Sequence, residues 1–161
     1  MWHVGRMGSV VVAVCLAGCC CMFPNGIFDL TRTRPDKKEI IGIWHANAKT
    51  LKWLKEQGYD TSSVTTFEFR DDDTFTMTGM PDCWREAFEN DWQKTFESGS
   101  GTWSLEEDEG YWEIELRFER PPWFPDGVDH TSLRLFHQEP PYIARTYVDP
   151  NQFNFLDFER Q

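Results

Sequence analysis

Five cysteines could carry covalent or metal chemistry in this 161-residue chain, and four of them lie close together near its start. Cys15 and the run 19–21 lie within seven residues, whereas Cys83 stands far from them. A disulfide framework needs cysteines spread over the fold. Zinc ligand pairs are usually separated by about two to four residues, because adjacent side chains point apart. The cysteine run fits neither chemistry, so we expect another group to be attached there.

The residues before the cysteine run have the pattern of a secretory signal. Residues 1–9 carry one basic side chain, Arg6, and no acid, and residues 10–16 are an unbroken apolar run followed by two small residues. The run is too short to cross a bilayer, which takes roughly 20 apolar residues. The pattern predicts that residues 1–18 are removed during export, and the open alternative is an ordinary secreted protein cut nearby.

The end of the run, Leu16-Ala17-Gly18-Cys19, resembles the lipobox of bacterial lipoproteins. The resemblance implies that a diacylglycerol is attached to the Cys19 thiol, that a peptidase cuts before Cys19, and that the new amino terminus is acylated. Two or more acyl chains on one residue anchor a protein stably. We therefore expect a lipid-anchored protein on the extracytoplasmic side of a cell membrane, with the roles of Cys20 and Cys21 left open.

The charge balance narrows the partners that the body of the protein can have. The chain has 27 acidic and 16 basic residues and a formal charge of -11. Such a surface repels nucleic acids and favours a soluble monomer or a basic partner. The length fits one domain. We predict a flexible lipidated tether over residues 19–38 and one folded domain over residues 39–161.

From residue 39 onward, short alternating apolar and polar runs separated by turn residues predict a meander of strands. The clearest alternation covers residues 111–119, where every second residue is apolar. Strands are expected at 39–46, 64–70, 74–79, 101–106, 111–119, 131–137, 142–148 and 153–160, and a helix at 48–57. Sequential antiparallel neighbours predict an all-β, up-and-down barrel of about eight strands, which leaves no free edge.

Two longer insertions, 81–100 and 120–129, interrupt the meander and carry many aromatic residues. Long loops in a compact domain are often functional, and tryptophans at the mouth of a barrel can line a ligand site. Trp84, Trp92 and Trp123 are therefore the candidate residues for binding a small apolar or amphiphilic ligand. The alternative is that these rings cap the core.

Two short motifs carry a resemblance for the folded domain. Gly42-Ile43-Trp44 resembles the Gly-x-Trp signature of lipocalin-like barrels, whose tryptophan closes one end of the barrel. The run at 99–105 is similar to small bacterial lipoproteins with no assigned activity. The resemblance implies a lipocalin-like barrel over residues 39–160 with an arginine packed on Trp44, for which Arg145 and Arg160 are equal candidates.

The remaining groups that could do chemistry have simpler explanations. Glu113 and Glu115 share a strand face with other charged residues, which is typical of a solvated outer face. The aspartates at 71–73 stand where a hairpin turn needs them, although they could bind calcium. The histidines have no metal-site spacing, and Cys83 has the acidic neighbours of an unreactive thiol.

We therefore predict no catalytic residues, no metal and no cofactor in this chain. The expected function is that of a non-enzymatic binding module for a small apolar or amphiphilic ligand. The alternative is an acidic protein-interaction or inhibitor domain that recognises a basic protein partner.

Overall fold

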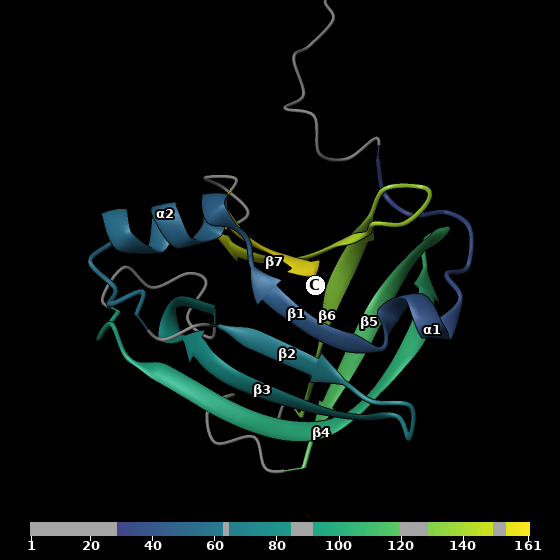
Figure 1. Ribbon diagram of the computed structural model, residues 1–161, viewed down its shortest axis with the longest axis horizontal. Coiled ribbons are helices and arrows are strands. Elements are labelled where there is room, and N and C mark those ends of the chain that lie inside the picture. Colours follow the sequence, from purple (N-terminus) through teal and green to yellow (C-terminus); the bar gives the residue numbers. More distant parts are fainter. Residues whose placement is uncertain (1–28, 63–64, 85–91, 120–128, 150–153) are drawn as a thin grey trace, which may run out of the picture.

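The protein is a closed barrel of eight antiparallel strands in the computed structural model, which describes residues 29–62, 65–84, 92–119, 129–149 and 154–161 (Figure 1). Each strand pairs with the next in sequence, and β1 pairs with β8 to close the barrel. This confirms the predicted all-β, up-and-down architecture. The strands are β1 Gly42–Ala46, β2 Thr66–Phe69, β3 Thr74–Pro81, β4 Phe96–Asp108, β5 Tyr111–Phe118, β6 His130–Phe136, β7 Ile143–Asp149 and β8 Asn154–Arg160.

The alternation of side chains along the strands agrees with the predicted faces. Phe67 and Phe69 on β2 lie opposite Met77 and Phe75 on β3, and all four are at most 1% exposed. On β5, Ile114 and Leu116 are fully buried, while Glu113 and Glu115 beside them lie on the outer face. Because neighbouring residues of a strand point to opposite sides, the inward rows form one core inside the barrel.

Two helices and a short 3-10 turn accompany the barrel. Helix α2 (Ala48–Glu56) was predicted, and the Asn47 side chain caps it by accepting from the Thr50 amide at 2.9 Å. Turn η1 (Asp82–Trp84) follows β3 directly. Helix α1 (Lys37–Ile40) replaces the expected start of the first strand at residue 39, because Asp36 caps a helical turn there. Strand β1 therefore begins only at Gly42.

Strand β4 is longer than predicted, since residues 96–100 of the expected insertion belong to it. Glycine at position 101, where the predicted strand began, has a packing reason. A Cβ at that position would lie 1.9 Å from the Arg117 carbonyl oxygen on β5. Only glycine allows so close an approach between the two strands.

The Gly-x-Trp motif lies at one end of the barrel, where α1 covers the core. Trp44 is 1% exposed, and its indole nitrogen donates to the Ile40 carbonyl at 2.7 Å. Arg160 is the cross-strand neighbour of Trp44 and donates to two carbonyls of α1, those of Lys38 and Glu39, at 3.0 Å each. Of the two candidate arginines, Arg160 is thus the one beside Trp44.

Residues 29–36, which we call the strap, pack against the same end of the barrel. Leu30 is buried against Tyr111 and Phe136. The Thr31 amide donates to the Leu135 carbonyl at 2.9 Å, and the Thr31 carbonyl accepts from the Trp112 amide at 2.8 Å. The strap therefore lies against the first residues of β5 and the last residues of β6. The part of the expected flexible tether (19–38) that the structure describes, from Asp29 onward, is bound to the barrel, because Leu30 joins an apolar cluster there.

Candidate functional site

The candidate site lies at the end of the barrel opposite the strap, where β1 leads into α2 and β3 leads into η1. Trp84 of η1 points into the barrel and is 6% exposed. Its indole nitrogen donates to the Thr146 hydroxyl at 2.7 Å, and its ring contacts Phe67 and Phe118 edge-on at 6.2 Å between centroids. Trp84 thus closes this end of the barrel from inside.

Aromatic rings occupy the interior beneath Trp84. Phe67 stacks on Phe69 at 5.8 Å and meets Phe158 edge-on at 5.0 Å, while Phe75 meets Phe118 at 5.2 Å. All five rings are at most 6% exposed. The inward side chains therefore pack against one another, as in a small barrel whose interior is filled.

A rim of three partly exposed side chains and one buried tyrosine surrounds this closed end. We define the rim as Trp53 of α2, Tyr59, Trp92 and Lys94. Trp53 and Trp92 are both half-buried and meet edge to face, with 6.2 Å between ring centroids. The Lys94 ammonium lies 4.8 Å from the Trp92 ring centroid and 5.0 Å from that of Tyr59. These distances suit cation–π attraction to both rings.

Lys94 has two further properties that are uncommon for a lysine. Its backbone has φ of +62°, in the left-handed region that residues other than glycine seldom adopt. Such conformations gather at functional sites. Among the described residues, its ammonium contacts aromatic rings and no carboxylate. The positive charge at the rim therefore has no counter-ion within the described part of the chain.

Hydrogen bonds to the buried Asp82 and Cys83 fix the position of the Tyr59 ring. The Tyr59 hydroxyl donates to Asp82 Oδ1 at 2.5 Å and accepts from the Cys83 amide at 3.2 Å. The Thr95 hydroxyl donates to Asp82 Oδ2 at 3.4 Å. Burial raises the pKa of the Tyr59 phenol, and the neighbouring carboxylate raises it further. Tyr59 thus remains a neutral donor that fixes the ring beneath Lys94.

Cys83 lies between Asp82 and Trp84 in η1 and is fully buried. Burial raises the pKa of its thiol to about 12. Because the thiolate is the reactive form of cysteine, this thiol is unreactive at neutral pH. The structure agrees with the interpretation of Cys83 as a buried free thiol.

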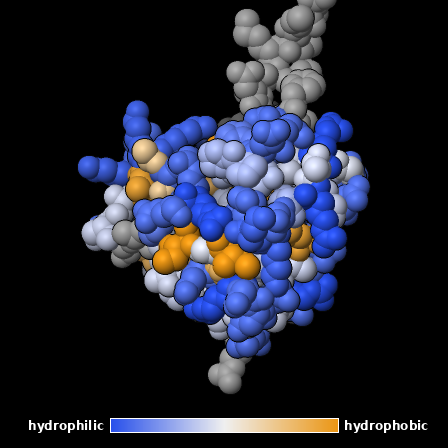
Figure 2. Space-filling view, turned by 45° about the vertical axis from the view of Figure 1, so that its right-hand side comes forward, coloured by the Kyte–Doolittle hydropathy of each residue, from blue (hydrophilic) through white to orange (hydrophobic). Residues whose placement is uncertain are grey.

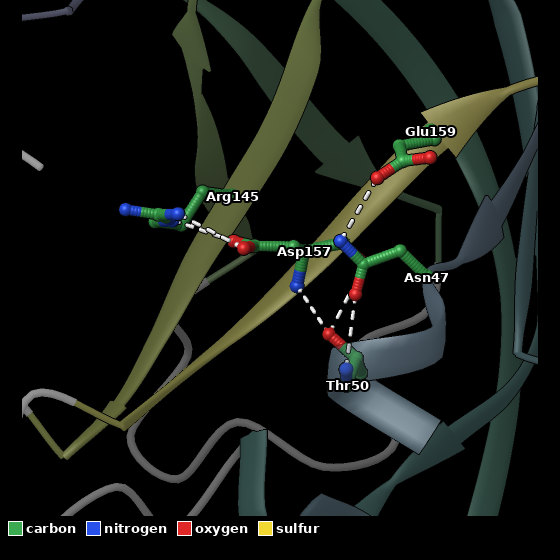
Figure 3. A network of polar contacts seen from close by, with 5 residues as sticks. All are labelled: Asn47, Thr50, Arg145, Asp157 and Glu159. Carbon is green, nitrogen blue, oxygen red and sulfur yellow. Dashed lines mark hydrogen bonds and ion pairs between the residues drawn. The ribbon is translucent and has the colours of Figure 1, made fainter. Parts of the chain in front are cut away.

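A polar network fixes α2, and with it Trp53, on the barrel wall (Figure 3). The Asp157 amide donates to the Thr50 hydroxyl at 2.7 Å, and the Asn47 side chain donates to Glu159 at 3.0 Å. Arg145 binds Asp157 through two nitrogen atoms, at 2.5 and 2.9 Å. Its guanidinium also lies between the Phe136 and Phe155 rings, at 4.3 and 4.2 Å. The start of α2 is therefore rigidly held.

The structure places the predicted ligand residues in different environments. Trp84 plugs the core, Trp92 belongs to the rim, and Trp123 lies outside the described residues, as does the lipid-attachment candidate Cys19. The sequence did not single out Trp53, Tyr59 or Lys94. The only sequence signal for Trp53 was its position in the predicted helix at 48–57. No local sequence pattern marks Lys94.

The other candidate groups do not converge. His130 and His137 flank opposite ends of β6, and His137 contacts the Pro141 carbonyl at 2.8 Å. Asp72 accepts from the Thr74 amide and hydroxyl, as a turn residue does. Glu115 pairs with Arg117 on the outer face at 2.6 Å. Within the described ranges, no three histidine, cysteine or acidic residues are arranged to hold a metal ion.

Comparison of the chain with protein-family models, with curated proteins and with solved structures finds no match. No helix within the described ranges combines the length and the apolar character needed to cross a membrane. On the face shown in Figure 2, hydrophilic residues predominate and hydrophobic ones form small separate patches.

Proposed function

We propose that this protein is a lipid-anchored, extracytoplasmic binding module that takes a small amphiphilic ligand at the rim. The anchor proposal is supported by the signal pattern and by the Leu-Ala-Gly-Cys sequence that ends at Cys19. The strap adds a spatial argument, because the chain reaches the barrel at the end opposite the rim. An anchor at Cys19 leaves the rim facing the aqueous compartment.

One observation carries the ligand proposal, namely the Lys94 ammonium held against two rings without a carboxylate partner among the described residues. The neighbouring Trp53 and Trp92 offer partly exposed apolar surface. A cation beside apolar rings complements a ligand with an apolar body and an anionic group. Because Trp84 and the phenylalanines occupy the interior, the ligand lies on the rim and not inside the barrel.

The anchor is tested by the Cys19→Ser variant. A hydroxyl is not a substrate for a thiol-directed acyl transfer, so the variant should lose lipid labelling and move to the soluble fraction. Cys20→Ser is the matched control and should remain labelled. Retention of label and membrane binding by Cys19→Ser would show that the lipobox interpretation is wrong.

The rim is tested by calorimetry with decanoate and decanol, which share a chain length and differ in charge. In the Cys19→Ser protein, decanoate should bind about tenfold more tightly than decanol, since a charge-assisted contact is worth about 1.4 kcal/mol or more. Lys94→Gln should remove this preference, whereas Lys52→Gln, at a highly exposed position of α2, should keep it. Equal affinities in the parent protein, or an equal loss in both variants, would refute the rim as an anion site.

A second function has its own supporting observation. Residues 106–109, all acidic and all exposed, form the tip of the β4–β5 hairpin, and the chain as a whole has a charge of -11. This surface suits a protein-interaction or inhibitor role with a basic partner. Reversing the charge of Glu107 and Asp108 to Lys should slow association with such a partner and weaken its salt dependence, and should leave decanoate binding unchanged.

A further inference from the structure

A cleft lies at the strap end, where the long β4–β5 hairpin extends beyond β3. Pairing between β3 and β4 stops at Thr74 opposite Thr102, while β4 and β5 stay paired to Asp108 opposite Tyr111. The notch beside the unpaired part of β4 is an open cleft of about 410 Å³. It is lined by Arg34, Lys37, Asp73, Trp103, Ser104, Leu105 and Glu106.

The charges in this cleft are of both signs, and among the described residues one of each sign has no oppositely charged partner. Lys37 pairs with Asp73 at 2.5 Å, so these two charges offset each other. Arg34 stacks over the Trp112 ring at 5.2 Å and has no carboxylate partner among the described residues. The Glu106 carboxylate accepts from the Ser104 hydroxyl at 2.7 Å and contacts no cation among the residues that the structure describes. A ligand that satisfies both Arg34 and Glu106 carries an anion and a cation.

The apolar lining of the cleft favours a ligand with a further apolar part. Trp103 is buried beneath Lys37, whose ammonium lies 5.6 Å from the ring centroid, and Leu105 is half-buried beside it. The guanidinium fork of Arg34 matches the geometry of a phosphate. A primary ammonium donates hydrogen bonds of the kind that the Glu106 carboxylate accepts.

The position of the cleft relative to the anchor identifies where such a molecule is abundant. Nine residues, 20–28, separate Cys19 from Asp29 on the barrel. Fully extended, the connection spans at most about 35 Å. If Cys19 is lipidated, as proposed above, the strap end therefore stays close to the bilayer surface, and the cleft lies at that end.

We infer that this cleft binds the headgroup of a zwitterionic phospholipid with a primary ammonium, with the phosphate at Arg34 and the ammonium at Glu106. The remaining charges at this end support a zwitterion and oppose an anionic lipid. The hairpin tip at 106–109 and the aspartates at 71–73 repel an anionic surface. A headgroup without net charge avoids this repulsion. The cleft thus orients the barrel on the membrane to which it is tethered.

The test uses the full chain with Cys19→Ser, so that acyl chains make no contribution, and measures flotation with vesicles. The protein should float with phosphatidylethanolamine vesicles and less with phosphatidylcholine vesicles, whose quaternary ammonium cannot donate to Glu106. Arg34→Gln and Glu106→Gln should each lower the bound fraction about three- to tenfold. Arg32→Gln and Glu107→Gln are matched controls on neighbouring exposed residues and should change it little. Urea midpoints close to that of the parent confirm folding of all four variants.

Three results would overturn the inference. The first is unchanged flotation in both Arg34→Gln and Glu106→Gln. The second is an equal loss in the two control variants, which would indicate general electrostatics. The third is binding of free phosphoethanolamine, measured by calorimetry, that is as tight as binding to phosphatidylethanolamine vesicles. This result would assign the cleft to a free zwitterion. None of these results depends on decanoate binding at the rim, so the two proposals fail separately.

Discussion

Removing one partner of the Arg145–Asp157 ion pair is the perturbation whose effect the structure defines best. The Arg145 and Asp157 side chains are 12% and 5% exposed, so both charges are largely shielded from water. Asp157→Leu leaves a guanidinium buried between the Phe136 and Phe155 rings without its carboxylate. Loss of one partner of such a pair costs about 3–5 kcal/mol. This is a large share of a total stability of about 5–15 kcal/mol.

Urea unfolding followed by tryptophan fluorescence measures this loss. With a slope of about 2 kcal/mol per molar for a small domain, the midpoint should fall by about 1.5–2.5 M. The double variant Arg145→Met with Asp157→Leu should recover most of the loss, because it leaves no charge buried. Glu56→Gln removes an exposed partner of Lys52, at 3.8 Å, and should cost under about 1 kcal/mol. A loss below about 1 kcal/mol in Asp157→Leu would show that the pair is hydrated and that α2 is not held as described.

Two further predictions concern the core. Leu116→Asp should unfold the domain, since an unpaired charge would be buried among core side chains. Glu115→Lys on the outer face should change the free energy of unfolding by under about 1 kcal/mol. If thermal melts show the opposite order of stability, the assignment of the two faces of β5 is wrong. The raised pKa of Cys83, about 12 in the folded protein, should lower stability as pH rises above the ordinary thiol value near 8.5, because only the unfolded chain loses the proton. The slope should approach about 1.4 kcal/mol per pH unit for this group up to pH 12, and Cys83→Ala should flatten it in urea titrations at pH 8 and pH 10; an unchanged slope in Cys83→Ala would contradict the assignment.

The strands with regular alternation were the part of the fold that sequence patterns predicted well. The β5 alternation fixes which face is buried, because a one-residue shift would expose Ile114 and Leu116. The strap escaped prediction because residues 29–36 are mostly polar, and their binding depends on Leu30 meeting Tyr111 and Phe136 from distant strands. Residues 96–100 of β4 were missed because glycine, which stands at position 99 among small polar residues, is uncommon in strands.

The candidate site was predictable only in part. Aromatic loop residues suggested Trp84 and Trp92, but the sequence could not show that Trp84 points inward to Thr146. The role of Lys94 depends on rings at positions 59 and 92, which come together only in the folded chain. Contacts of this kind are set by tertiary packing and leave no periodic trace in the sequence.

The central claim, that the ligand lies on the rim and outside the filled barrel, is tested most directly by the indole N–H signals in a heteronuclear NMR titration with decanoate. The account predicts that the signals of Trp53 and Trp92 shift with one common affinity. The signals of Trp44 and Trp103, which are buried at the strap end, should stay in place. Shifts concentrated at Trp44 and Trp103, or no shift at Trp53 and Trp92 at saturating decanoate, would contradict it.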